Sequence, residues 1–130
     1  MSWSSSDARV ELIARFTALP GREDEVARLL LALTATVRKE PGCLAFEPSR
    51  VAAPPTGSGL APSPEPVGMA FVVAESYRDE AAFAAHLAAP YAAVFNDTLG
   101  PLIEESCSQL TFLAPLGQPL HAGAAADRGR

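Results

Sequence analysis

The order in which two periodicities alternate along the chain is the feature that most constrains its fold. Residues 9–17 alternate between apolar and polar side chains, and this period of two predicts a β-strand. After a Pro-Gly turn, apolar residues recur at helical spacing from Val26 to Val37, which predicts an amphipathic helix. Residues 43–51 again favour a strand. The first half of the chain is therefore predicted to be a strand–helix–strand unit.

The second half of the chain repeats this order. Residues 67–77, "VGMAFVVAESY", are apolar on both faces, which indicates a strand in the middle of a sheet. Asp79 is a suitable N-cap for the helix that follows. Pro90 is expected to end or kink that helix, because proline removes a helical hydrogen bond. Residues 107–116 predict the last strand.

The order β-α-β-β-α-β with right-handed connections gives a four-stranded antiparallel sheet with both helices on one face. This is the ferredoxin-like α+β arrangement. Pro48 cannot donate a hydrogen bond to a neighbouring strand, so the strand at 43–51 is expected at a sheet edge. The second face of the sheet stays uncovered and still carries apolar side chains. We therefore expect a homodimer joined through the sheet faces.

These elements are expected to form one domain, residues 9–116, because 130 residues leave room for one hydrophobic core. Residues 52–66 contain five prolines and two glycines in fifteen positions and show no periodicity. They predict a flexible loop inserted between the second and third strands. Residues 1–8 and 117–130 are predicted to be flexible tails.

Charge and composition exclude several classes of function. The net charge is −5 and no basic cluster occurs, which argues against binding to nucleic acid or to an anionic membrane. No apolar run approaches the ~20 residues that cross a bilayer, and the first residues lack the apolar segment of a signal peptide, so a cytoplasmic protein is expected. The chain has two cysteines and two histidines, too few to suggest a dedicated metal site. We expect neither a metal nor another cofactor.

Glu75, Tyr77 and His86 are the candidate catalytic residues. Glu75 continues an apolar stripe of the third strand, where an unpartnered charge would be costly, and Tyr77 lies beside it on the same face. His86 falls about 60° from the inward face of its helix, which Phe83 defines, by the geometry of the α-helix. A Glu–Tyr–His cluster at the edge of an apolar cleft is typical of a small-molecule pocket. The same cluster can equally be a structural link between strand and helix.

Four aromatic side chains are the candidate substrate-binding residues of this pocket. Phe83 belongs to the helix that carries His86, and the others come from the third strand and from the segment after Pro90. The set is Phe71, Phe83, Tyr91 and Phe95.

Three segments occur in a recognisable order: "PGREDEVARLLLAL", "VRKEPGCLAFE" and "VAESYRDEAAFAAHLAAPY". Together they resemble the antibiotic biosynthesis monooxygenase (ABM) domain family, over about Arg9 to Pro115. The resemblance implies a dimeric α+β barrel, in which two ferredoxin-like sheets face each other. Glu75, Tyr77 and His86 match the family's recurrent E-x-aromatic and F-x-x-H positions. Haem degradation, one activity of the family, is disfavoured because Tyr77 stands where that branch has tryptophan.

The resemblance and the cluster together favour a cofactor-independent monooxygenase that joins O₂ to a small aromatic, polyketide- or quinol-like substrate. An imidazole, whose ordinary pKa is about 6.5, suits a base or proton shuttle at neutral pH, and this role falls to His86. Glu75 would orient His86 or raise its basicity, and Tyr77 would hydrogen-bond the substrate oxygen. Two alternatives remain. The same cluster could isomerise a small keto compound, or the protein could be a non-catalytic ligand-binding dimer.

Overall fold

The computed structural model of the protein describes residues 8–117. The predicted tails, residues 1–8 and 117–130, lie outside the described residues except for their innermost positions.

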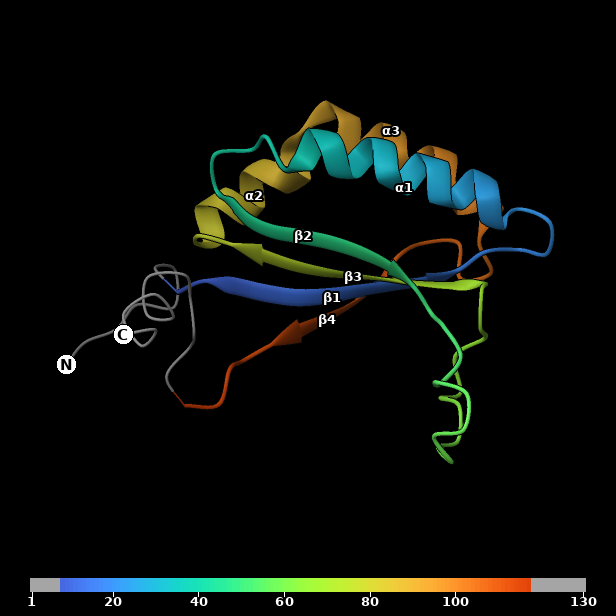
Figure 1. Cartoon of the computed structure of the whole chain (residues 1–130). Helices are drawn as coiled ribbons and strands as arrows, with labels where there is room; N and C mark the ends of the chain where they lie inside the picture. Colours follow the sequence, from blue (N-terminus) through green and yellow to red (C-terminus); the bar gives the residue numbers. More distant parts are fainter. Residues whose placement is uncertain (1–7, 118–130) are drawn as a thin grey trace.

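Four strands and three helices follow one another in nearly the predicted order (Figure 1). As predicted, the second helical segment is interrupted at Pro90, and it forms two helices and a short 3-10 turn. The elements are β1 (Val10–Thr17), α1 (Glu23–Val37), β2 (Cys43–Arg50), β3 (Ala70–Tyr77), α2 (Glu80–Ala88), α3 (Pro90–Leu99), a 3-10 helix (Gly100–Leu102) and β4 (Gln109–Leu113).

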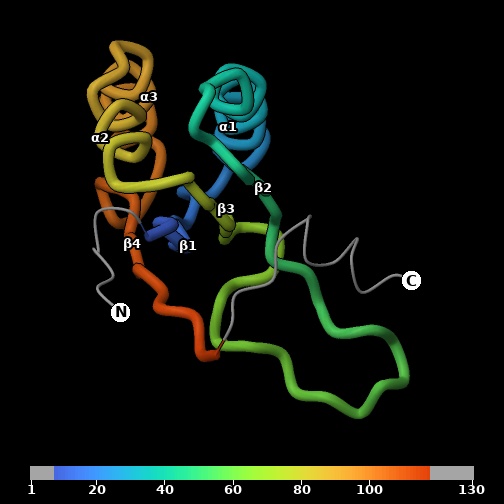
Figure 2. The backbone as a smooth tube through the Cα atoms, turned by 90° about the vertical axis from the view of Figure 1, so that its left-hand side faces the viewer, coloured from blue at the N-terminus to red at the C-terminus, as the bar shows by residue number. Residues whose placement is uncertain are grey.

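The strands form a single sheet in the order β2-β3-β1-β4, and every neighbouring pair is antiparallel. The predicted ferredoxin-like α+β fold is confirmed, with β3 in the interior and β2 at an edge. All three helices cover the same face of the sheet, as the two views at right angles show (Figures 1 and 2). In Figure 2 α1 lies over the β2 side, and α2 and α3 lie over the β4 side.

The helix boundaries follow from capping chemistry. The Asp79 carboxylate accepts a hydrogen bond of 2.8 Å from the backbone N–H of Ala82, which confirms the predicted N-cap of α2. Ala89 is extended, with φ −64° and ψ 133°, so α2 ends there and α3 starts anew with Pro90 in its first turn. A residue before proline disfavours helical geometry, and this explains the break.

Two predicted strands are shorter than expected. β3 begins at Ala70 rather than at residue 67, because Gly68 adopts a positive φ of 80° in a turn that brings the chain back from the loop. β4 spans residues 109–113 instead of 107–116, and it pairs only with the part of β1 from Glu11 to Arg15. Its five side chains are all exposed, so packing does not extend the strand further.

The hydrophobic core lies between the sheet and the helices. β1 contributes Phe16, which stacks on Phe71 of β3 with 5.9 Å between ring centroids. α1 contributes Val26 and Leu30, which are 0% and 3% exposed. The core is continuous along most of the sheet, but towards the α2 end the space between sheet and helices opens into a cavity.

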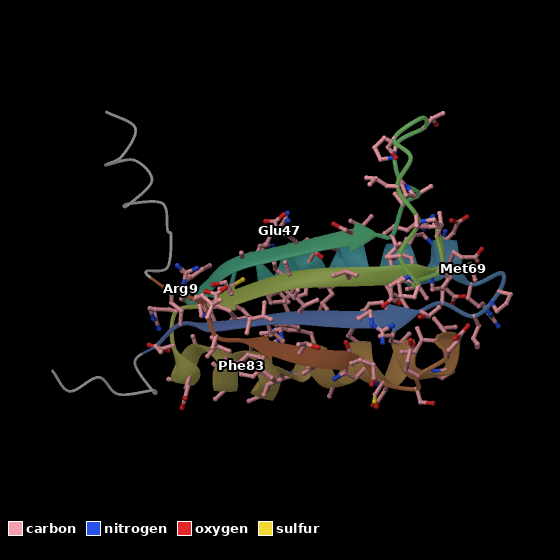
Figure 3. All side chains as sticks on the ribbon, turned by 90° about the horizontal axis from the view of Figure 1, so that it is seen from below. Arg9, Glu47, Met69 and Phe83 are labelled. Atoms are coloured by element: carbon pink, nitrogen blue, oxygen red, sulfur yellow. The ribbon has the colours of Figure 1, made fainter. Side chains whose placement is uncertain are left out.

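The other face of the sheet is not covered by any helix (Figure 3). It presents Ile13 and Arg15 of β1 beside Val72 and Ala74 of β3. The loop between β2 and β3, which includes the predicted 52–66 insertion, projects from the sheet on this uncovered side (Figure 1). No helix within residues 8–117 has the length and apolar character needed to cross a bilayer.

Candidate active site

A cavity of about 400 Å³ lies between the sheet and the helices. Its walls are mainly apolar. The sheet supplies Leu12, Ala14, Phe46 and Val73, and the helices supply Leu30, Leu33, Phe83, Leu87 and Phe95. The titratable side chains of Glu75 and His86 interrupt this apolar surface, and Asp97 and Cys107 also line the cavity. A mostly apolar cavity with a few convergent polar groups is the usual form of a small-molecule site.

Glu75 is held by its neighbours on three strands. Leu12 of β1 and Phe46 of β2 are its register partners, so both flanks of the carboxyl group are apolar. Its side chain is nearly buried, and Tyr77 donates a hydrogen bond of 2.7 Å to Glu75 Oε1. Burial raises the pKa of Glu75, and the Tyr77 hydroxyl and the nearby His86 oppose this rise only in part. The site therefore favours the protonated carboxyl group more than water does.

Tyr77 lies behind Glu75 and is completely buried. Burial, followed by the charge and hydrogen bond of Glu75, raises the pKa of the Tyr77 phenol well above its ordinary value. Tyr77 is absent from the cavity wall. Its predicted position beside Glu75 is found, but its hydroxyl is used to hold Glu75 and not to face the cavity.

His86 lies on α2 among aromatic rings. Its ring centroid is 4.9 Å from that of Tyr77, 6.1 Å from that of Phe83 and 6.3 Å from that of Phe46. The structure thus brings His86, Glu75 and Tyr77 to one end of the cavity. Glu75 does not orient His86 as expected, because the carboxylate that lies within hydrogen-bond distance of the imidazole is that of Glu40. His86 Nδ1 lies 3.2 Å and 3.1 Å from the two carboxylate oxygens of Glu40.

Glu40 stands in the turn between α1 and β2, and it joins three elements. It binds His86 of α2, and it accepts a hydrogen bond from the hydroxyl of Tyr91 in the first turn of α3. Burial and this hydrogen bond raise the pKa of Tyr91 to about 12. The sequence analysis gave no role to Glu40, which stands directly before Pro41 after the first helix.

A close approach of two backbones makes the Glu40–His86 contact possible. A Cβ atom placed on Gly42 would lie 2.2 Å from the Cβ of Ala82, one helical turn before His86. Only glycine leaves room for α2 to come this near to the turn that carries Glu40. The glycine of the "EPG" motif was the available signal, although sequence alone does not say which element it touches.

The four predicted substrate-binding aromatics divide into two groups. Phe83 and Phe95 line the cavity. Tyr91 and Phe71 do not: Tyr91 binds Glu40, and Phe71 is covered by the Phe16 ring in the core. The stripe of β3 continues past the cavity, so a position on the correct face is not enough to place Phe71 in it.

The sequence analysis also missed the polar side of the cavity. Asn96 and Asp97 of α3 and the segment Ser106–Ser108 before β4 line it. Ser106 has a positive φ of 69°, which is unusual for a residue other than glycine. The described wall of the cavity contains no lysine or arginine. Its electrostatic character is therefore acidic to neutral.

Cys43 is half-buried and Cys107 is exposed, and both are free thiols. Burial and the nearby Glu40 raise the pKa of Cys43, so its thiolate forms less readily than that of an ordinary cysteine. Among residues 8–117, no three histidine, cysteine or acidic side chains come together in a way that could hold a metal ion.

The sequence profile of the antibiotic biosynthesis monooxygenase family matches residues 9–98 of the chain. A search of curated proteins gave no significant match.

Several solved structures share the fold. Rv0793 from Mycobacterium tuberculosis is 26% identical, with a TM-score of 0.68, and the match covers 85% of this chain and 98% of that one. PA3566 from Pseudomonas aeruginosa is 24% identical, with a TM-score of 0.65 and coverage of 88% and 100%. A candidate antibiotic biosynthesis monooxygenase from Caulobacter crescentus CB15 is 21% identical, with a TM-score of 0.68 and coverage of 87% and 94%.

Proposed function

The chain belongs to the antibiotic biosynthesis monooxygenase family, and from this premise we propose that it is a cofactor-independent monooxygenase of a small, uncharged aromatic substrate. The single observation that carries the proposal is the placement of Glu75 and His86 in the wall of a mostly apolar cavity. The two groups differ in environment. Glu75 sits between apolar neighbours that favour its protonated form, whereas His86 is bound to a carboxylate. A pair of titratable groups with contrasting surroundings suits an acid and a base.

The reaction begins with removal of a proton. His86 takes a proton from a phenol or from an acidic C–H group of the substrate, and Glu75 donates a hydrogen bond to the oxygen on which negative charge develops. The electron-rich anion passes one electron to O₂, and the resulting substrate radical and superoxide combine through a new C–O bond. The peroxide then receives the proton from His86. The attacked carbon loses its remaining hydrogen as a proton, the O–O bond breaks, and a C=O group and water form. For an anthrone, the methylene carbon becomes a carbonyl, and O₂ supplies both that oxygen and the oxygen of the water.

The wall of the cavity supports an uncharged aromatic substrate. Its sides are aliphatic and aromatic, and Phe83, Phe95 and Phe46 offer ring faces and edges to a flat molecule. No lysine or arginine among the described residues of the wall is available to bind a phosphate or carboxylate. Asp97 would in addition repel such an anion. Phenols and hydroquinones fit these conditions, since they enter neutral and ionise only at the base.

The test uses anthrone and 1,4-dihydroxynaphthalene as probes with an oxygen electrode. The protein should accelerate O₂ uptake, and His86→Ala should reduce kcat by between about 100-fold and 10,000-fold, the usual contribution of a general base. His86 is only partly exposed, so circular dichroism must show that the variant is folded. Ala81→Gly, a substitution at an exposed position of the same helix, is the matched control and should retain activity.

Two other results would replace the proposal. Exchange of a substrate C–H proton with solvent without O₂ uptake would indicate a keto–enol isomerase that uses the same acid and base. Saturable binding of the probes with neither reaction would indicate a ligand-binding protein.

The uncovered face of the sheet supports the further proposal of a homodimer joined through this face. Ile13 and Val72 are half-buried and Ala74 is exposed on this face, where a single chain leaves them in contact with water. Ala74→Arg, a substitution at an exposed position of this face, should shift the sedimentation coefficient from that of a dimer to that of a monomer. Ala81→Arg on α2 should leave the dimer intact, and a wild-type monomer at micromolar concentration would contradict the proposal.

A further inference from the structure

Glu40 is a carboxylate whose described partners are all in the site. Its side chain is 15% exposed, and its only ion pair within residues 8–117 is with His86, whose side chain is 11% exposed. The arginine nearest in sequence, Arg38, is engaged elsewhere, because it donates to the backbone carbonyl of Phe46 and to the Glu47 carboxylate. The described hydrogen-bond partners of the Glu40 carboxylate are therefore the imidazole of His86 and the hydroxyl of Tyr91.

This arrangement determines which nitrogen of His86 carries a proton. Tyr91 donates its hydroxyl proton to Glu40, so Oε2 of Glu40 acts as an acceptor. An imidazole is a stronger base than a carboxylate, so a proton shared between Glu40 and His86 belongs to the nitrogen. Nδ1 is that nitrogen, since it lies within 3.2 Å of both carboxylate oxygens. In the neutral imidazole, the lone pair must then be on Nε2.

Nε2 of His86 makes no hydrogen bond to any residue between 8 and 117, and His86 forms part of the cavity wall. The groups that face the ring from neighbouring elements are the aromatic rings of Phe46, Tyr77 and Phe83, the Glu40 carboxylate and, within electrostatic range, Glu75. None of these described groups competes for Nε2 by a hydrogen bond. The free lone pair is the acceptor that a substrate proton needs.

We propose that Glu40, held in place by Tyr91, is the positioning residue that keeps the His86 proton on Nδ1, so that Nε2 is the atom that accepts a proton from the substrate. The catalytic part of this inference rests on the proposed function. The structural part, that His86 is the Nδ1–H tautomer, does not depend on it. It also assigns a role to Tyr91 other than the substrate contact expected from sequence. A shared carboxylate fixes both the rotation of the imidazole and its tautomer.

The test is the nitrogen spectrum of the imidazole in the full chain. A long-range proton–nitrogen correlation at about pH 8.5, where a free imidazole is neutral, distinguishes the two tautomers. The chain has two histidines, so comparison with His86→Ala assigns the His86 signals without ambiguity. The wild-type protein should show the Nδ1–H tautomer of His86. Observation of the Nε2–H tautomer in the wild-type protein would overturn the proposal.

Glu40→Gln supplies the second arm. The glutamine amide can donate to Nδ1, so the His86 population should move towards Nε2–H, and kcat should fall at least ~10-fold with KM changed less than ~2-fold. Glu47→Gln, which removes an exposed carboxylate on β2 outside the cavity, is the matched control and should change neither the tautomer nor kcat. Tyr91→Phe should keep the Nδ1–H tautomer, because Glu40 remains.

The two experiments distinguish failure of the positioning role of Glu40 from failure of the monooxygenase proposal. If His86 is the Nδ1–H tautomer and Glu40→Gln reverses it, while neither probe is oxidised, the positioning role stands and the monooxygenase proposal fails. If the probes are oxidised but Glu40→Gln leaves both tautomer and kcat unchanged, the positioning role fails and the monooxygenase proposal stands.

Discussion

The contact between Gly42 and Ala82 offers a direct test of how the site is assembled. Gly42→Ala would add a Cβ only 2.2 Å from the Cβ of Ala82, whereas ordinary contacts begin at about 3.4 Å. The turn and α2 must therefore separate by more than 1 Å. Gly42 does not have a positive φ, so the backbone itself accepts alanine, and the cost comes from the contact alone.

Overpacking of this kind costs about 1–3 kcal/mol. For a domain of this length, 1 kcal/mol shifts the melting temperature by about 4 °C, so Gly42→Ala should lower it by about 4–12 °C. A separation above 1 Å would also carry the 3.1 Å contact between Glu40 and His86 Nδ1 beyond hydrogen-bond distance. Activity with the probes should therefore fall more than stability alone explains.

The double variant Gly42→Ala/Ala82→Gly moves the methyl group from one side of the contact to the other. Ala82→Gly alone should cost about 1–2 kcal/mol from helix propensity and a lost buried methyl group, and Ala81→Gly, at an exposed position, controls for the propensity. In the Ala82→Gly background the new Cβ has its nearest remaining neighbour at 3.4 Å, so Gly42→Ala should cost close to nothing. Thermal unfolding of the four-member cycle measures this coupling. If Gly42→Ala costs the same in both backgrounds, the close approach is not the reason that position 42 is glycine.

Three further predictions concern titration and the inserted loop. Tyr77 and Tyr91 are the only tyrosines and both have a raised pKa, so the folded protein should show little tyrosinate absorbance between about pH 10 and 11, and unfolding in that range should release it at once. Because burial raises the pKa of Glu75, the unfolded chain loses this proton at a lower pH than the folded chain, and the contribution of Glu75 to stability declines as the pH rises from the ordinary value to the raised one. Glu75→Gln should therefore gain stability relative to wild type between about pH 4 and neutrality, and parallel denaturation curves would contradict this. Replacement of residues 53–64 by a short Gly-Ser linker should lower the melting temperature by less than about 4 °C, since the removed side chains are almost all exposed; a larger fall would show that the loop is docked.

Most of the fold could be predicted because it depends on local periodicity. The alternation in β1 and the i, i+3, i+4 spacing in α1 identify elements that each bury one face, and chain connectivity then leaves few ways to join them. The errors lie at the ends of strands. Gly68 turns the chain just before β3, and all five residues of β4 are exposed. Neither fact is visible in the apolar pattern.

The site could be predicted only as far as side chains on one element define it. Glu75 and Tyr77 were placed together because they are two residues apart on one strand, and His86 was placed near the cavity by its helical angle. The partner of His86 could not be predicted in this way, because it depends on how closely two separate elements approach. That distance is short because Gly42 has no side chain, and the pattern of apolar residues does not show which element a glycine contacts.

The carboxyl groups of Glu40 and Glu75 both lie near the imidazole of His86, but only Glu40 is within hydrogen-bond distance of it. Glu75 is fixed by the sheet, where apolar neighbours and the Tyr77 hydroxyl already determine its position and favour its protonated form. An acid of this kind is a poor partner for a base that must keep one nitrogen free. Glu40 comes from outside the sheet and reaches His86 from the side of the turn, so one carboxylate can orient the base while the other lies in the cavity wall. The proposed division of labour between the acid Glu75 and the positioning residue Glu40 thus depends on the approach of α2 to the α1–β2 turn. Gly42→Ala perturbs this approach, and the double variant Gly42→Ala/Ala82→Gly relieves the contact.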